Sequence, residues 1–416
     1  MIDLVLWLGG LTGSGVLGVL SYGTWRAIPC FAVYGLLYGS GADARWHEYG
    51  HGTAFRTRWL NAFGYQLGSF MNMLEPTVWR WSHARHHTDT LVVGRDPEID
   101  VMRPARLVRI IANFFGLVYV PMMLARVLYH ATGRITSEEA SFLPATELRK
   151  VFRTARVWLA IYAAMIAACI AFASPLPFLL VLGPRFYGAF LGQLFVLTQH
   201  SGLGEDFLDH RLNTRTVLMN PIFRFLYLNM NYHVEHHMFP LVPYHKLPAL
   251  HAAVKHDLVP ASPSLFAAYR EIVPAVIRQL RDQTYYIHRE LPLGAHPYRT
   301  PPVDSVRVFR VSASTWIAVC AVDDVEFEDV VPFDHAGGDY ALYRAPDGSF
   351  YATEGHCTHE RARLCDGLVM GSIIECPRHN GRFDYRTGEA KGAPAIIDLR
   401  TYRTRVDDGT VYVFID

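Results

Sequence analysis

Nine histidines stand in four clusters, each close behind an apolar stretch of the chain. The clusters read WHEYGH, HARHH, TQHSG and HVEHH, and their histidines are His47, His51, His83, His86, His87, His200, His233, His236 and His237. Spacings of three and four residues place side chains on one face of a helix. Imidazole is a ligand for iron, zinc, copper and nickel. Convergence of these helical faces would therefore create a metal site.

One of the clusters also fits a different chemistry. The stretch HEYGH matches the H-E-x-x-H signature of zinc proteases, with Glu48 as the general base. That motif has only three fixed positions, and it leaves seven histidines unexplained. We keep a membrane zinc metalloprotease as a distant alternative.

A second group of possible ligands lies near the C-terminus. Cys357 and His359 are followed by Cys376 and His379. Two Cys and two His in this order are typical of a Rieske [2Fe-2S] centre, in which two histidines replace two cysteines on one iron. A Cys2His2 zinc site is the alternative.

The elements that position the histidines begin with long uncharged stretches. Residues 4–25 carry no charge, and roughly 20 apolar residues suffice to cross a bilayer. A second apolar run follows at 27–42, so we predict a hairpin of two spans. Residues 157–184 and 186–199 predict a second hairpin, broken at the prolines of SPLP, 174–177.

Topology decides how two further apolar runs, 59–74 and 110–125, lie relative to the membrane. All histidine clusters must lie on one side of the membrane, so neither run can cross it, and we predict interfacial helices. Basic residues concentrate in the segments assigned to the cytoplasm, which is the positive-inside pattern. They are Arg45, Arg56, Arg58, Arg103, Arg106, Arg109, Arg149 and Lys150.

The chain changes character after the helical segments. Residues 286–304 are rich in Pro and Gly and predict a linker. Short β-branched runs separated by turn signals follow, which predicts an all-β soluble domain over 305–416. The predicted domains are therefore a membrane domain, 1–285, and this β domain. The formal net charge of +1 argues against a nucleic-acid partner. The irregular spacing of six cysteines predicts a reducing compartment.

The histidine boxes HxxxH, HxxHH and HxxHH, with an extra histidine before the third, resemble the integral-membrane fatty acid desaturase and hydroxylase superfamily. The resemblance covers roughly residues 1–280. It implies four membrane helices under a cytosolic cap and two non-haem irons bound by the nine histidines. Asn229 could hold a metal-bound water, and acids such as Asp43, Asp96, Asp206 and Asp209 could orient the rings. Residues 305–416 resemble Rieske ferredoxins, with Cys357, His359, Cys376 and His379 as cluster ligands.

Together the two resemblances imply a membrane-bound, O2-dependent di-iron oxidoreductase that receives electrons from its own Rieske domain. No nucleotide-binding motif is evident, so a separate NAD(P)H-dependent flavin reductase is the expected electron source. We expect hydroxylation or oxidative demethylation of an organic substrate; fatty acyl desaturation is the alternative, and an electron-transfer protein without turnover stays open. The expected location is the inner membrane, in contact with lipid, with both metal sites on the cytoplasmic side. A homo-oligomer is left open.

Overall fold

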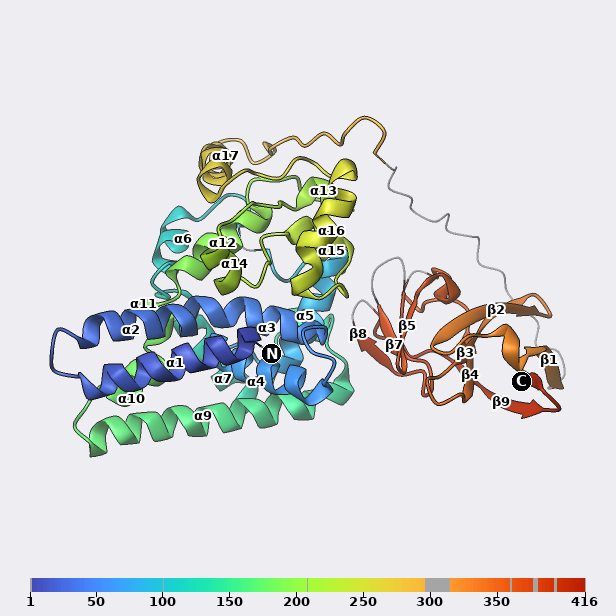
Figure 1. Cartoon of the computed structure of the whole chain (residues 1–416). Coiled ribbons are helices and arrows are strands. Elements are labelled where there is room, and N and C mark those ends of the chain that lie inside the picture. The colour runs from blue at the N-terminus through green and yellow to red at the C-terminus, as the bar shows by residue number, and fades with distance from the viewer. Residues whose placement is uncertain are drawn as a thin grey trace. The chain divides into compact units, whose positions relative to one another are not determined.

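The computed structural model of the chain describes residues 2–99, 101–207, 209–295, 315–359, 361–376, 381–392 and 395–415. Helices occupy the first part of the chain and β-strands the last part (Figure 1). This order of a helical region and an all-β domain confirms the predicted fold class at that level. Residues 296–304 of the predicted linker lie outside the described residues.

The first helical hairpin carries the chain into the first histidine cluster. Its outward leg is α1 (Ile2–Leu20), and its return leg consists of α2 (Ala27–Gly35), a π-helical turn η1 (Leu36–Ser40) and α3 (Gly41–His51). The two legs lie side by side (Figure 1). The Trp7 indole N–H donates to the Leu37 carbonyl at 2.8 Å and joins them.

The second hairpin has one intact leg and one broken leg. The outward leg is α9 (Leu148–Ala171), and the chain reverses at the SPLP prolines as predicted. The return leg consists of α10 (Leu176–Val181), α11 (Pro184–Tyr187) and α12 (Phe190–His200). The sequence predicted only the break at the SPLP prolines, and the further breaks between α10 and α11 and between α11 and α12 were not predicted.

Tyrosine hydroxyls stabilise the broken leg. Pro184 has no N–H to donate to the Leu180 carbonyl, so a regular helix cannot continue there. Three successive carbonyls accept hydroxyl donors instead: Leu179 from Tyr187 (2.8 Å), Leu180 from Tyr34 (2.8 Å) and Val181 from Tyr38 (2.7 Å). Backbone that departs from a helix at membrane depth requires such partners.

The two return legs cross where only small residues fit. A Cβ built on Gly188 would lie 1.9 Å from the Gly35 carbonyl oxygen, and one on Gly39 would lie 2.6 Å from the Gly188 carbonyl carbon. The Ser40 hydroxyl donates to the Gly188 carbonyl at 2.6 Å. Close backbone approach at small residues is a common way to pack helices in a membrane.

Shorter helices surround the two hairpins. They are α4 (Arg58–Asn72), α5 (Pro76–Asp89), α6 (Leu107–Asn113), α7 (Tyr119–Ala131), α8 (Ser137–Ala140), α13 (His210–Asn213), α14 (Pro221–Leu226), α15 (His233–Met238), α16 (Leu247–Val254) and α17 (Leu265–Arg278). The run 59–74 is helical as predicted. The run 110–125 is not one helix, because Gly116 adopts φ +65° between α6 and α7. A Cβ there would lie 2.5 Å from the Arg185 carbonyl oxygen, so a glycine is required.

Among the residues that the structure describes, length and hydropathy identify two helices that could cross a membrane, Ile2–Leu20 and Ala145–Ala171. The four predicted spans are thus supported by this measure only for the two outward legs, since the return legs are divided into short helices. Arg45, one of the basic residues in the segments assigned to the cytoplasm, does not lie at the surface. It is fully buried, between the rings of Trp7 (4.9 Å) and Phe225 (5.1 Å).

The β part consists of two antiparallel sheets. The strands are β1 (Thr315–Ala321), β2 (Asp329–His335), β3 (Gly338–Arg344), β4 (Phe350–Glu354), β5 (Leu368–Met370), β6 (Ile373–Glu375), β7 (Arg382–Asp384), β8 (Ala390–Gly392), β9 (Thr401–Asp407) and β10 (Thr410–Ile415). One sheet has the order β1-β10-β9-β4-β3-β2 and the other β5-β6-β7-β8. The rings of Tyr343 and Tyr385 stack at 4.5 Å in the core of this part. The turn signals AGGD, APDG and DDGT separate consecutive strands, as predicted.

Candidate metal centres

The histidine clusters lie at the ends of four helices. His47 and His51 are on the last turns of α3, which ends at Gly52 with φ +77°. His83, His86 and His87 are on α5, whose start is capped by the Glu75 carboxylate accepting from the Val78 N–H at 2.8 Å. His200 is the last residue of α12, and α15 carries His233, His236 and His237. The positions of these helices thus set where each imidazole is attached to the backbone.

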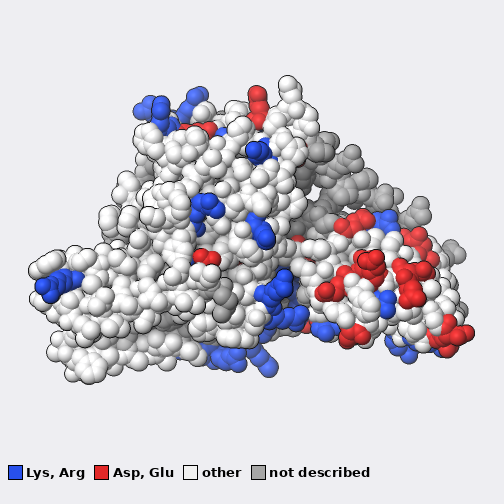
Figure 2. All heavy atoms as spheres, in the orientation of Figure 1, with Lys and Arg blue, Asp and Glu red and all other residues white. Residues whose placement is uncertain are grey.

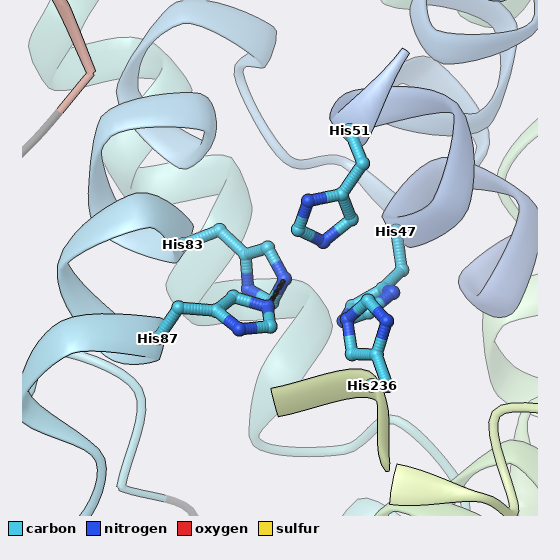
Figure 3. Close-up of side chains that lie close together, drawn as sticks. All are labelled: His47, His51, His83, His87 and His236. Carbon is cyan, nitrogen blue, oxygen red and sulfur yellow. Dashed lines mark hydrogen bonds between the residues drawn. The ribbon is translucent and has the colours of Figure 1, made fainter. Parts of the chain in front are cut away.

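Five of these histidines form one group. The ring nitrogens of His47, His51, His83, His87 and His236 offer ligand atoms that all lie within 4.8 Å of one another. Figure 3 shows the five rings turned towards a common centre from α3, α5 and α15. The group contains the two histidines of the first cluster and two of the second.

The other four form a second group. His86, His200, His233 and His237 also offer ligand atoms within 4.8 Å of one another. The structure therefore brings all nine predicted histidines together, in two sets.

The two HxxHH motifs each contribute to both groups. On α5, His83 and His87 belong to the five-histidine group and His86 to the other; on α15, His236 belongs to the five-histidine group and the flanking pair to the other. A helix turns about 100° per residue, so residues i and i+4 share a side while i+3 lies about 60° away. Each of these two helices therefore carries ligands of both groups, on different sides, and links the groups to each other.

The nitrogen spacings fit metal coordination. Nε2 of His83 and Nε2 of His87 are 3.0 Å apart, and Nε2 of His233 is 3.2 Å from that of His200 and 3.1 Å from that of His237. Two nitrogens bound to one ion at about 2.1 Å are separated by about 3.0 Å when they subtend a right angle. These buried imidazoles therefore suit a transition metal in each group.

Neighbouring groups fix the rings through the opposite nitrogen. His200 Nδ1 lies 3.0 Å from the Asn213 carbonyl oxygen, which can only accept, so Nδ1 carries the proton and Nε2 is free to bind metal. His237 Nδ1 lies 3.1 Å from the Thr90 hydroxyl. Such partners orient metal-binding rings. Neither partner was predicted from the sequence, although Thr90 lies three residues after His87.

Glu235, inside the fourth cluster, HVEHH, was also missed. Its carboxylate is fully buried, accepts from the Thr216 hydroxyl at 2.5 Å and pairs with Nδ1 of His251. Thr216 and His251 belong to different segments, so Glu235 ties α15 to both. Its position between two proposed ligands was the signal that could have identified it.

Glu48 of the HEYGH motif does not have the setting that a protease would need. Its Oε1 accepts from the Thr53 hydroxyl at 2.8 Å and from the Tyr244 N–H at 3.0 Å. The flanking histidines belong to a five-histidine group rather than to a zinc site with an open position. The geometry thus disfavours the protease alternative.

Asn229 and Asp209 have structural partners. The Asn229 amide accepts from Arg224 Nε at 2.8 Å and donates to the Tyr244 carbonyl at 3.0 Å. Asp209 caps α13 and pairs with Arg211 at 2.8 Å. These contacts leave the predicted roles of both residues at the metal without support, since both carboxylate oxygens and the amide are engaged elsewhere.

The other three predicted acids differ among themselves. Asp96 accepts from the backbone N–H groups of Leu91 and Glu98, each at 2.8 Å, and Asp206 accepts from that of Val93 at 3.0 Å. These two acids hold the loop after α5. Asp43 lies one helical turn before His47, on the same side of α3.

Cys357 and Cys376 of the β part each donate a backbone hydrogen bond to a carbonyl five residues further along the chain. The Cys357 N–H donates to the Ala362 carbonyl, and the Cys376 N–H donates to the Gly381 carbonyl, both at 2.8 Å. Both cysteines are buried, and His359 is half-buried. His379 lies outside the described residues. Cys365 is half-buried.

Comparison with known proteins agrees with both halves. The model of the family described as "Fatty acid desaturase" matches residues 23–269, and that of the "Rieske [2Fe-2S] domain" matches residues 315–403. The desaturase domain implies a di-iron site and the Rieske domain a [2Fe-2S] cluster, with O2 as a consistent co-substrate. The two histidine groups and the paired cysteine loops fit these cofactors.

The β part is similar to ferredoxins of aromatic dioxygenases. It is 42% identical over 93 residues to the ferredoxin component of the naphthalene 1,2-dioxygenase/salicylate 5-hydroxylase systems of Ralstonia sp, covering 22% of this chain and 88% of that protein. It is 40% identical over 98 residues to the naphthalene 1,2-dioxygenase ferredoxin component of Pseudomonas putida, covering 24% and 93%. A chain in the solved complex of reduced oxygenase and oxidized ferredoxin of carbazole 1,9a-dioxygenase is 38% identical, covering 24% and 91%, with a TM-score of 0.23.

The desaturase match spans more than half of the chain and contains all nine histidines. The chain therefore belongs to the fatty acid desaturase family and carries a C-terminal Rieske [2Fe-2S] domain.

Proposed function

We propose that this protein is a membrane-embedded di-iron oxygenase that hydroxylates, or oxidatively demethylates, an organic substrate and receives electrons through its own Rieske domain. The observation that carries the proposal is the arrangement of nine histidines, seven buried and two half-buried, in two groups on the same chain as a Rieske domain. The nine histidines are the proposed iron ligands, and Cys357, His359, Cys376 and His379 are the proposed cluster ligands.

The overall reaction sets what the chain must supply. In hydroxylation, one oxygen atom of O2 enters a C–H bond and the other leaves as water, with two electrons and two protons consumed. When bound, the iron pair supplies the O2 chemistry. The protein holds the imidazoles in fixed orientations through Thr90, the Asn213 carbonyl and Glu235.

Electrons are proposed to enter through the Rieske domain. Its relatives are ferredoxin components of dioxygenase systems, which supports a separate NAD(P)H-dependent flavin reductase as the donor. Fusion in one chain gives the donor an effective concentration of roughly millimolar relative to the iron pair. The proposed location of both sites is the cytoplasmic side of the inner membrane.

Four membrane-crossing segments are proposed, although two are broken. The carboxylate of Asp3, at the start of α1, accepts from the Tyr244 hydroxyl at 2.5 Å, seven residues after His237. The first hairpin therefore starts near the fourth histidine cluster, HVEHH, and ends within the first. Large apolar side chains are exposed along both outward legs, among them Leu6 and Leu17 of α1 and Ile166 and Ile170 of α9. Figure 2 shows a wide band over α1, α2 and α9 with few charged atoms, which suits contact with lipid.

The test is turnover with isotopic oxygen. Purified, iron-loaded protein would be incubated with a flavin reductase, NADH and 18O2 across acyl lipids and small metabolites. Label in a product supports hydroxylation, labelled formaldehyde or a lost methyl group supports demethylation, and loss of two mass units without label supports desaturation. Protein that holds zinc and no iron beyond the [2Fe-2S] cluster would overturn the proposal.

A further inference from the structure

The helix that ends at His200 is capped by a single arginine. Arg215 donates from Nη1 to the Thr198 carbonyl at 2.8 Å and from Nη2 to the Ser201 carbonyl at 3.1 Å. Its backbone N–H donates to the Gln199 carbonyl at 2.8 Å. Three carbonyls around His200 are thus held by one residue.

The physical reason lies in the end of α12. The last carbonyls of a helix have no partner within it, and the negative end of the helix dipole favours a cation there. The planar guanidinium presents several donors in a rigid fork and can hold two carbonyls at once. Arg215 is 3% exposed. Burial lowers its pKa to about 10, so it remains charged at neutral pH.

The charge of Arg215 is balanced from α17. Arg215 Nε lies 3.4 Å from Oε2 of Glu271, and the same oxygen accepts from Arg289 Nη2 at 2.6 Å. Arg289 belongs to residues 283–289, which we call the linker root because they lead from the helical region into the linker predicted from 286. The side chains of Glu271 and Arg215 therefore connect the linker root to the end of α12 that carries His200.

The linker root makes further contacts with the loop that follows His200. The Ile287 N–H donates to the Gly202 carbonyl at 2.8 Å, and the ring of Tyr286 packs on that of Phe207 at 5.6 Å. Arg103 donates both to the Gln283 carbonyl (3.2 Å) and to the Leu203 carbonyl (2.6 Å). These residues are therefore part of the helical region rather than of a free tether, although the sequence predicted a linker from 286.

The ring of His200 is fixed by the segment that carries Arg215, since its Nδ1 faces the Asn213 carbonyl at 3.0 Å. We propose that Arg215 is a positioning residue for His200, and that Glu271 and the linker root hold it in place. The inference rests on the proposed function, because it takes His200 as an iron ligand. It follows that changes in the linker root alter iron binding in the four-histidine group, whereas changes beyond residue 289 do not.

The test compares full-length variants enriched in 57Fe by Mössbauer spectroscopy and iron analysis. Arg215→Met is expected to reduce the iron outside the [2Fe-2S] cluster from two ions per chain to one, because only the four-histidine group loses its ligand geometry. Arg215→Lys keeps a cation at the helix end and is expected to recover part of the lost signal. The matched control is Arg270→Met, an exposed arginine beside Glu271 with no hydrogen bond among the described residues.

Glu271→Gln provides an independent variant if Arg215→Met does not yield folded protein. It leaves the hydrogen bonds of Arg215 to the helix in place and removes only the balancing charge. One of the two irons is then expected to be released to a chelator about tenfold faster than in the wild type, within the range for partners of metal ligands. The Rieske signal serves as an internal standard in every sample.

Two outcomes would overturn the inference. Equal loss of both irons would mean that Arg215 supports the fold in general, and unchanged iron in both variants would mean that His200 is held without it. Failure of the proposed function gives a different result, since the wild type would then hold no iron beyond the cluster.

Discussion

The two metal sites of this chain are built in opposite ways. The histidine centre draws its residues from four helices between positions 47 and 237, and two of those helices serve both histidine groups. The proposed cluster ligands in the β part come from two short loops, within 23 positions from Cys357 to His379. The histidine centre therefore depends on the packing of the whole helical region, whereas the cluster depends on two local turns.

This difference predicts how far the effect of a substitution extends beyond the residue that is changed. A change at a shared helix such as α15 alters both histidine groups, since His236 serves one and its neighbours the other. A substitution in a cysteine loop is expected to alter the cluster and to leave both histidine groups unchanged. The predictions below test this contrast, beginning with the largest expected effect.

His236→Ala is expected to reduce turnover to background. The variant removes one ring from the five-histidine group and disturbs the packing of α15, which also carries two rings of the other group. The measurement is product formation together with the electron paramagnetic resonance signal of the reduced Rieske cluster, which should be unchanged. The control is His245→Ala, because that side chain is exposed. Loss of the Rieske signal in His236→Ala would contradict two independent sites.

Cys376→Ser is expected to show the converse. The cluster signal disappears and NADH-driven turnover stops, but two irons per chain remain, because no helix that carries the histidines is touched. Iron analysis and Mössbauer spectroscopy measure the remainder. Cys365→Ser, at a half-buried cysteine outside the proposed ligand set, should retain four irons per chain. If Cys376→Ser also loses the other two irons, the contrast between a local and a distributed site is wrong.

The contrast also explains what could be predicted from the sequence. The spacing within HxxxH and HxxHH reveals which rings share a helix face, so the nine histidines could be identified without a structure. The assignment of His86 and His236 to opposite groups could not, since it depends on how helices distant in sequence converge. The same limit applies to Glu235, whose partners Thr216 and His251 lie 19 and 16 residues away.

The breaks of the return leg were missed for a related reason. Apolar composition over 27–42 and 157–199 indicates helices that suit a membrane, but it does not indicate where a helix can be interrupted. Pro184 has no N–H to donate to a carbonyl of α10. The break is tolerated because the hydroxyls of Tyr34 and Tyr38, from the other hairpin, donate to the carbonyls of this leg. Arg45 is likewise buried by rings that are remote in sequence, which the charge pattern did not indicate.

Glu235→Gln is expected to have an intermediate effect, about 10–100-fold weaker iron retention. The amide keeps the shape of the carboxylate but loses its negative charge beside His251 and one acceptor for that ring or for Thr216. Both irons should be lost at similar rates, since α15 carries rings for both groups, and this distinguishes the variant from those at Arg215. The measurement is the rate of iron transfer to a chelator, with Glu326→Gln at an exposed site as the control. Release of a single iron would show that the two groups are held independently.

Tyr38→Phe is expected to have the smallest effect and to separate stability from metal binding. Tyr38 is buried, and its hydroxyl is the donor for the Val181 carbonyl in the broken leg. Removal of this hydroxyl should lower the stability of the helical region by about 0.6–2 kcal/mol, the range for a hydrogen bond between membrane helices. The thermal midpoint of the helical region in detergent should fall by a few degrees, while the Rieske signal and the iron content stay as in the wild type. Tyr22→Phe, at an exposed tyrosine in the turn after α1, should leave the midpoint unchanged. Iron loss in Tyr38→Phe at temperatures below the midpoint would mean that the broken leg controls the histidine groups directly, through α12 and His200, and not only through the stability of the bundle.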